Sequence, residues 1–200
     1  MPRIAPLDPQ NASGETADIF REIKAAFGMV PNLFRTSAHY PPLLKANWNK
    51  VKAVMAEGRL RRKVKETIAL LVSKDNGCDY CVAAHSAALR SIGTSPEEIA
   101  GIMKDLAGSD FSAKERGLIG FARRANLAPS DITEEEFQAL KGLGATDAEI
   151  VEALGVMELF AGFNKFLDSL RVDIDVPRRG GMRETPCEKP SLRSRCFFRD

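Results

Sequence analysis

Four helix-start signals in the second half of the sequence constrain the fold most strongly. Each places a glutamate three residues after a serine or threonine, and the four pairs are Ser95 and Glu98, Ser112 and Glu115, Thr133 and Glu136, and Thr146 and Glu149. In such a capping box the hydroxyl accepts a hydrogen bond from a free backbone N–H, and the glutamate reaches back to the cap residue. No strand-like alternation of useful length precedes residue 176, so the sequence predicts an all-α protein.

Apolar residues at helical spacing predict further helices in the first half. One stripe steps through Leu44, Trp48, Val51 and Met55 at intervals of four, three and four residues, which is the period of a packed helix. Prolines separate such segments, because proline lacks the backbone donor that a helix interior needs. Two helices are expected over residues 62–73 and 78–91, and the last helix is expected to continue to residue 170.

The chain contains an internal similarity. Residues 88–99 resemble residues 139–150, and Lys65-Glu66 aligns with Lys114-Glu115 when the register is shifted by two residues. We interpret this as a duplicated helical unit whose two copies pack about a pseudo-twofold axis. Chance similarity between two short capped helices is the alternative.

Charge and hydropathy argue against several classes of protein. The chain has 29 basic and 27 acidic residues, so a bulk attraction to nucleic acid or acidic membranes is not expected. No apolar run approaches the roughly 18 residues that span a bilayer, and the N-terminus lacks a hydrophobic signal core. We therefore expect a cytoplasmic protein whose partners include neither nucleic acid nor membrane.

Composition divides the chain into three parts. Residues 1–15 carry three prolines and predict an irregular arm, and residues 16–175 form the predicted helical domain. Residues 176–200 combine basic residues with proline and glycine, and predict a basic, flexible tail without a core of its own. The thiols of Cys187 and Cys196 are interpreted as incidental, with pairing inside the tail or to another subunit as the alternative.

Basic residues cluster between positions 59 and 65, across the start of the helix expected at residue 62. We interpret this run as a solvated helix start or entry loop. A mouth that attracts anionic partners is the alternative.

Cys78 and Cys81 form a Cys-x-x-Cys pair where the helix 78–91 is expected to begin. This spacing lets the two sulfurs meet across one helical turn, and the free N–H groups and positive dipole end of a helix N-terminus stabilise a thiolate. On an ideal helix Cys81 lies on the buried stripe and Cys78 lies at its lip. The pattern predicts thiol–disulfide chemistry with a sheltered inner thiol and an outer thiol that a partner can reach.

His85 and Glu66 are the candidate partners of this thiol pair. His85 follows Cys81 by four residues, so its ring is expected over the same helix face, where it can accept or relay the thiol proton. Glu66 aligns with Glu115, which its capping box accounts for. The residue three before Glu66 is a lysine, which cannot cap in that way, so we expect Glu66 to orient His85 instead.

Two structural interpretations of the same residues stay open. A zinc site wants four ligands; Cys78, Cys81 and His85 could supply three, and Glu66, His39 or a tail cysteine the fourth. No second ligand pair lies at metal spacing, however, and we assign no metal and no cofactor. Plain core packing also produces a cysteine pair and a buried histidine.

The arrangement of Glu66, Cys78-x-x-Cys81 and His85 resembles the signature of the AhpD-like alkylhydroperoxidase, or carboxymuconolactone decarboxylase, superfamily. Flanking segments resemble its peroxidase-related branch, namely Gly28-Met29-Val30-Pro31-Asn32-Leu33-Phe34, Pro41-Pro42-Leu43-Leu44 and Phe160-x-x-Phe163-Asn164-Lys165. The resemblance covers about residues 15–177. It implies an all-helical fold with a duplicated unit, assembled as a homo-oligomer.

The resemblance also implies a role for each residue of the signature. Cys81 would be the peroxidatic thiol that becomes a sulfenic acid, and Cys78 would donate a proton and then close the disulfide. His85 and Glu66 would form the proton relay. The decarboxylase branch generally lacks the cysteine pair, so its reaction is disfavoured. Tyr80 stands where the AhpD peroxidase has a histidine, and we interpret it as a packing residue or pocket wall.

These observations lead to one main functional hypothesis and two alternatives. The main hypothesis is a thiol-dependent peroxidase that reduces hydroperoxides and is recycled by a dithiol or protein reductant. The first alternative is a thiol–disulfide oxidoreductase or redox-sensing module without peroxide turnover. The second is a structural zinc protein.

Overall fold

The computed structural model describes residues 1–175. The predicted tail, with Cys187 and Cys196, lies outside this range. The described chain contains helices and no strand, which confirms the predicted all-α class. The first five α-helices are α1 (Gly14–Phe27), α2 (Asn32–Ser37), α3 (Pro41–Met55), α4 (Arg62–Asp75) and α5 (Asp79–Ser91). They are followed by α6 (Pro96–Lys104), α7 (Ala113–Leu127), α8 (Glu134–Gly142) and α9 (Asp147–Leu170).

Three short 3-10 turns complete the described elements. They are η1 (Pro9–Asn11), η2 (Leu106–Gly108) and η3 (Pro129–Asp131). The segment predicted as an irregular arm, residues 1–15, therefore holds η1 and the first residues of α1. The division of the chain into arm, domain and tail stays a prediction.

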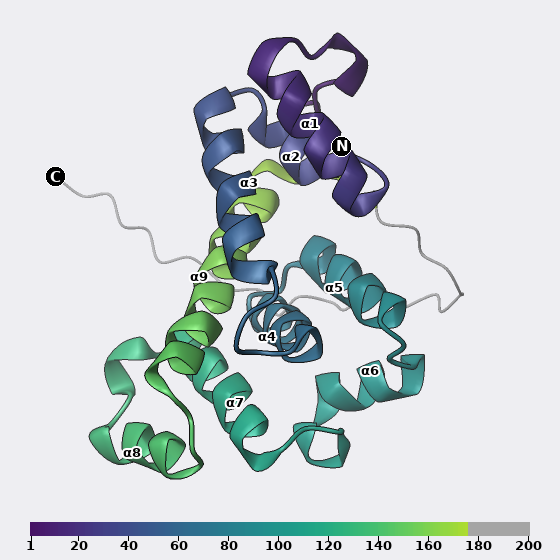
Figure 1. Ribbon diagram of the computed structural model, residues 1–200. Helices are drawn as coiled ribbons and strands as arrows, with labels where there is room; N and C mark the ends of the chain where they lie inside the picture. The colour runs from purple at the N-terminus through teal and green to yellow at the C-terminus, as the bar shows by residue number, and fades with distance from the viewer. Residues whose placement is uncertain (176–200) are drawn as a thin grey trace, which may run out of the picture.

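Helix α4 lies at the centre of the molecule. It packs against α5, α7 and α9, and Figure 1 shows these helices around it. Residues 64–73 of α4 are all buried, so this helix has no solvent-exposed face over most of its length. A polar side chain on α4 must consequently find its partner inside the protein.

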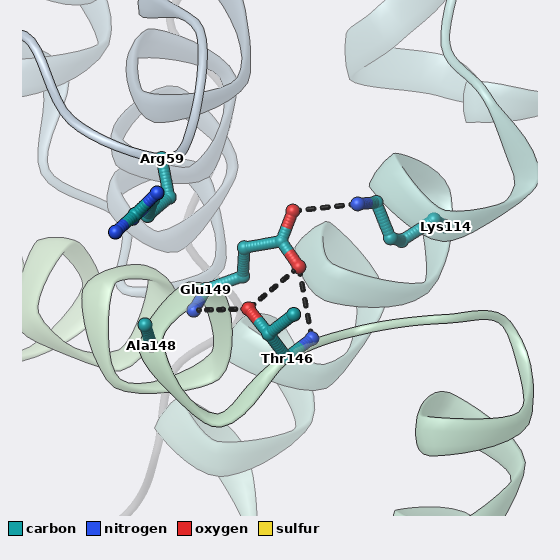
Figure 2. Close-up of a pocket in the computed structure, with 5 residues that line it drawn as sticks. All are labelled: Arg59, Lys114, Thr146, Ala148 and Glu149. Carbon is teal, nitrogen blue, oxygen red and sulfur yellow. Dashed lines mark hydrogen bonds and ion pairs between the residues drawn. The ribbon is translucent and has the colours of Figure 1, made fainter.

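The order of the helices supports the predicted duplicated unit at the register of its longer match, in which residues 88–99 correspond to residues 139–150. One shift along the sequence carries α4, α5 and α6 onto α7, α8 and the start of α9, and it carries Lys63 onto Lys114 and Glu98 onto Glu149. Each lysine pairs with its glutamate at 2.6 Å, and Figure 2 shows the second of these pairs.

With this register the counterpart of Glu66 is Gly117, and the alignment of Glu66 with Glu115 was wrong. A Cβ atom on Gly117 would lie 2.9 Å from Leu143 Cδ1 and 3.1 Å from Leu140 Cδ1. The second unit therefore packs α8 closely against α7 at the position where the first unit holds a buried carboxylate.

Three of the four predicted capping boxes form with both hydrogen bonds, at Ser112, Thr133 and Thr146. At the fourth, the Ser95 hydroxyl accepts from the Glu98 backbone N–H as predicted. Glu98 also pairs with Lys63 through its carboxylate. Local sequence therefore identified every one of these helix starts.

Lys65 corrects the interpretation of the basic run as entirely solvated. Its side chain is buried, and its Nζ donates to the carbonyl oxygens of Val54 (2.9 Å) and Ala56 (2.7 Å) and pairs with Glu152. A Cβ atom at Gly58 would overlap with the Glu152 carboxylate, so glycine permits this close approach. Lys65 thereby fastens the loop between α3 and α4 to α9.

The part of the chain that the structure describes has no helix with the length and apolar composition that a membrane crossing requires.

Candidate functional site

The two cysteines lie at the junction between α4 and α5. Gly77 has φ of +73°, a left-handed conformation that glycine adopts without strain, and it lets the chain turn back against α4. Cys78 is the N-cap residue of α5, and its N–H donates to the Ser73 carbonyl at 2.9 Å. The predicted start of a helix at the cysteine pair is confirmed.

The prediction that Cys78 is an outer, reachable thiol was wrong. Cys78 has an exposed fraction of 0% and Cys81 of 3%, so both sulfurs are buried. The helical periodicity of α5 placed Cys78 at the edge of that helix's own buried face. The neighbouring helices, which periodicity cannot reveal, cover the edge. A reagent therefore reaches either thiol only when the structure opens locally.

Cys81, His85 and Leu89 form the buried face of α5, one helical turn apart from each other. The expected sharing of one face by Cys81 and His85 is confirmed. Helical spacing would extend this face to Ile92, but Ile92 lies beyond the end of the helix and is 41% exposed. The His85 ring also packs edge-on against Phe160 of α9, with 4.2 Å between ring centroids, which fixes the orientation of the imidazole.

Glu66 contacts His85 as expected, across the interface between α4 and α5. Its Oε2 atom lies 2.8 Å from His85 Nδ1, and its Oε1 atom accepts from Arg62 Nε at 3.0 Å. Burial raises the pKa of Glu66, but its bonds with His85 and then Arg62 outweigh this effect and hold the pKa below its usual value. An ionised carboxylate can only accept, so Nδ1 carries the proton and Nε2 is the basic nitrogen.

The two thiols are free, and each affects the ionisation of the other. Donation from Cys81 lowers the pKa of Cys78, although burial opposes this. The bond with Cys78 and burial raise the pKa of Cys81 well above its usual range. Two adjacent buried thiolates repel each other strongly, so the first ionisation belongs to the pair and leaves one shared proton.

Other helices place polar groups beside each sulfur, and the sequence analysis did not identify them. Asp168 of α9 bonds with Cys78 and acts to raise the pKa of that thiol. Asn164 of α9 and Ser73 of α4 bond with Cys81 and act to lower the pKa of that thiol. The sequence signal that could have identified Asn164 is a polar residue on the otherwise apolar face of its helix.

A chain of amide side chains leads from α7 to Ser73 of α4. Asn126 donates to Asn76 Oδ1 at 2.9 Å, Asn76 donates to Asn164 Oδ1 at 2.9 Å, and Asn164 donates to Ser73 Oγ at 3.0 Å. Asn164 and Ser73 are both almost completely buried. The network joins α4, α7 and α9 through buried polar side chains.

Tyr80, between the cysteines, fastens the end of the described chain to the site. Its hydroxyl donates to Asp175 Oδ1 at 2.8 Å, and Asp175 Oδ2 accepts from the Asn32 backbone N–H at 2.5 Å. Burial and the charge of Asp175 raise the pKa of Tyr80, so the phenol stays protonated and serves as a donor. Tyr80 is buried, as expected of a packing residue, and its hydroxyl also holds residues 172–175 beside α2.

Metal ligation was the structural alternative for these side chains. Within residues 1–175, no group of three or more histidine, cysteine, aspartate or glutamate side chains has an arrangement that could hold a metal ion. His39, one suggested fourth ligand, bonds with the Ala5 carbonyl oxygen at 2.9 Å.

A surface pocket of about 400 Å³ lies in the second unit rather than at the cysteines. Figure 2 shows its lining residues, Arg59, Lys114, Thr146, Ala148 and Glu149. Glu149 accepts from Lys114, from the Thr146 hydroxyl and from the Thr146 backbone N–H. These contacts close a capping box and link α7 to α9, so the polar groups of the pocket have a structural role.

Comparison with known proteins points to one family. Residues 41–124 match the model of the carboxymuconolactone decarboxylase family. A segment of 90 residues, 45% of this chain, is 30% identical to an alkyl hydroperoxide reductase of Mycobacterium tuberculosis. The match covers 26% of that relative, so this chain aligns with about a quarter of its length.

Solved structures share the fold over most of their length. An uncharacterised peroxidase-related protein from Ralstonia eutropha JMP134, described as an alkylhydroperoxidase AhpD core, superposes with a TM-score of 0.78 at 25% identity, covering 87% of this chain and 92% of that one. A peroxidase-related protein from Silicibacter sp. TM1040 gives 0.73 at 26% identity, covering 86% and 88%. The debrominase Bmp8 gives 0.75, covering 86% and 91%, but at 19% identity it shows the fold alone.

Proposed function

We propose that this chain is a thiol-dependent peroxidase. It has the AhpD-like fold, and its residues 41–124 match the model of the carboxymuconolactone decarboxylase family. The observation that carries the proposal is the buried bond between Glu66 and His85, one helical turn from a free Cys-x-x-Cys pair. An ionised carboxylate that fixes the tautomer of a histidine leaves its other nitrogen able to move a proton. A structural cysteine pair needs no such arrangement.

In the proposed reaction Cys81 attacks the hydroperoxide as a thiolate. A sulfur–oxygen bond forms, the oxygen–oxygen bond breaks, and the alkoxide takes a proton to become an alcohol. The sulfur is oxidised by two electrons to a sulfenic acid. His85 Nε2 is the group assigned to carry the proton, and Glu66 stabilises the imidazolium that forms.

Cys78 completes the cycle in this proposal. Its sulfur attacks the Cys81 sulfenic acid, a disulfide forms, and the sulfur–oxygen bond breaks. The departing hydroxide takes a proton and leaves as water. An external dithiol, small or protein-borne, then reduces the disulfide and is itself oxidised to a disulfide.

The pKa of Cys78 is lowered and that of Cys81 is raised, so the proposal requires the shared proton to move from Cys81 to Cys78 before the attack. In the reduced pair, the Cys81 thiol donates toward Cys78. A shift of that one proton to Cys78 produces the Cys81 thiolate without taking a proton from bulk water.

A turnover assay tests the proposal. The purified chain should consume an alkyl hydroperoxide with dithiothreitol as reductant, and Cys81→Ser should abolish this. Cys78→Ser should still form a sulfenic acid, which dimedone traps on Cys81, but should lose disulfide formation. Peroxide consumption that persists in Cys81→Ser contradicts the mechanism. Rapid thiol–disulfide exchange without peroxide consumption would instead favour an oxidoreductase or redox-sensing role.

A homo-oligomeric state is a separate part of the proposal, and it rests on the resemblance to the family. Sedimentation of the purified chain tests it, and a monomer at all concentrations would contradict it.

A further inference from the structure

The turn that carries Cys78 is formed by the end of α4. The Cys78 N–H donates to the Ser73 carbonyl at 2.9 Å, and the N–H of the left-handed Gly77 donates to the Lys74 carbonyl at 3.0 Å. These two bonds make a Schellman motif, a common way for a helix to end. Cys78 is at the same time the N-cap residue of α5. The backbone position of this cysteine therefore depends on how firmly the end of α4 is held.

Helix α7 of the second unit holds this turn through two pairs of side chains. The Arg123 guanidinium donates twice to the Asp75 carboxylate, with both bonds at 2.7 Å. Asn76 and Asn126 exchange two amide hydrogen bonds, at 2.9 Å and 3.2 Å. A bidentate pair between charged groups is strong and fixes direction as well as distance. The Asp75 side chain is only 10% exposed, so solvent screens this pair less than it screens a surface ion pair.

Helix α9 also holds the turn. Asn164 accepts from Asn76 at 2.9 Å and donates to the Ser73 hydroxyl at 3.0 Å. Residues 73, 75 and 76 are thus each bonded to a side chain that lies outside α4 and α5, and none of these bonds uses a sulfur atom. Closing a disulfide between the two cysteines does not consume any of the groups that make them.

The duplication gives this arrangement a simple description. In the register that matches residues 88–99 to residues 139–150, Asn126 at the end of α7 is the counterpart of Asp75 at the end of α4. The corresponding ends of the two units therefore meet where α4 packs against α7 (Figure 1). Helices α7, α8 and α9 contain no cysteine, so α7 contributes to the cysteine pair by holding the turn that carries it.

We propose that Arg123 and Asn126 are positioning residues, through which the cysteine-free unit keeps Cys78 in place to attack the oxidised sulfur of Cys81. A turn that is already held loses little further freedom when the disulfide closes, and such preorganisation raises the effective concentration of one reacting group at the other. The inference rests on the proposed function only in that this disulfide is a step of the proposed cycle. The stability of the disulfide can be measured without any peroxide.

The test measures the equilibrium between dithiol and disulfide in the full-length protein, in buffers of reduced and oxidised glutathione. One glutathione disulfide is reduced to two thiols for each protein disulfide that forms. After acid quenching, free thiols are alkylated in denaturant, and peptide mass spectrometry distinguishes the Cys78–Cys81 pair from the two tail cysteines. The measured quantity is the effective concentration of the pair, which converts to its reduction potential.

Arg123→Ala should lower this effective concentration about tenfold, because ordering the backbone of one residue changes an equilibrium by about five- to thirty-fold. For a two-electron couple, that change raises the reduction potential by about 30 mV. Asn126→Ala should act in the same direction. Arg123→Lys keeps the charge and loses the bidentate geometry, so it should recover part of the effect.

Arg124→Ala is the matched control, because Arg124 is the next residue of α7 and contacts Asp131 and Glu136 of the second unit. Its reduction potential should equal that of the parent, whatever the substitution costs in thermal stability. Thermal unfolding identifies any variant that fails to fold, and Asn126→Ala, which removes only neutral bonds, keeps the test decisive if Arg123→Ala does so.

The outcomes separate this inference from the proposed function. Unchanged potentials in Arg123→Ala and Asn126→Ala, or an equal shift in Arg124→Ala, overturn the inference and leave the peroxidase proposal standing. A parent protein that forms no disulfide between Cys78 and Cys81 overturns both. Shifted potentials in a protein that consumes no peroxide would contradict the proposed function and support the positioning role.

Discussion

Replacing Glu66 with glutamine tests the proton relay more sharply than any other single change. Glu66→Gln keeps the size of a side chain that is 3% exposed, so it opens no cavity, and it removes the negative charge that faces His85. Glutamine can still accept a hydrogen bond from Nδ1 through its amide oxygen. The substitution therefore isolates the charge of the carboxylate from its shape.

The size of the effect follows from the two bonds that Glu66 makes. Arg62 is 54% exposed, so solvent screens that ion pair and its loss costs little. The bond with His85 is buried on both sides, and a hydrogen bond to a charged group is worth about 1.5–3 kcal/mol against about 1 for a neutral one. The charge thus contributes about 1–2 kcal/mol, and its loss should slow the peroxide reaction about tenfold.

The assay is single-turnover oxidation of the reduced protein by an alkyl hydroperoxide, followed as loss of free thiol. Glu115→Gln is the control, because Glu115 pairs with Arg61 and closes a capping box in the second unit, away from the cysteines. It should cost little stability, because glutamine also closes a capping box and the ion pair with Arg61 is partly exposed, and it should leave the oxidation rate unchanged. An unaltered rate in Glu66→Gln, or equal losses in both variants, would refute the relay.

Three further predictions concern stability and access. Gly58→Ala should lower the free energy of unfolding by about 1–3 kcal/mol in urea titrations, because its Cβ would overlap with the Glu152 carboxylate. Bonds with its lysine partner and helix cap lower the pKa of Glu149 to about 2, so its stabilising contribution should be complete above pH 4.5 and fall progressively as the pH drops toward 2. Tyr80→Phe should speed native-state alkylation of the cysteines about tenfold, because it removes the bond that holds Asp175.

Each of these has a matched control. Gly101 has open space around its Cβ position, so Gly101→Ala should leave stability unchanged or raise it slightly. The loss of stability between pH 4.5 and pH 2 should disappear in Glu149→Gln. If that variant loses stability over the same pH range as the parent, the effect does not come from Glu149. Tyr40→Phe removes an exposed hydroxyl and should leave alkylation rates unchanged; an equal acceleration in both tyrosine variants would contradict the role of Tyr80.

Much of the fold was readable from the sequence because its signals are local. The caps at Ser112, Thr133 and Thr146 engage backbone groups three residues away, and helix periodicity depends on neighbours within a turn or two. The same locality placed Cys81 and His85 on one face. Glu66 was identified partly through an alignment in the wrong register, but its contact with His85 is real.

The sequence by itself determined the helices, the thiol pair and the face on which His85 lies, since each depends on spacing along one segment. Only the tertiary structure decided which groups surround the sulfurs. Asn164 bonds with Ser73 from 91 residues away in the chain, and no pattern within one helix can encode that approach. The burial of Cys78 has the same cause, because whether a helix edge meets water or protein depends on the segments that pack over it.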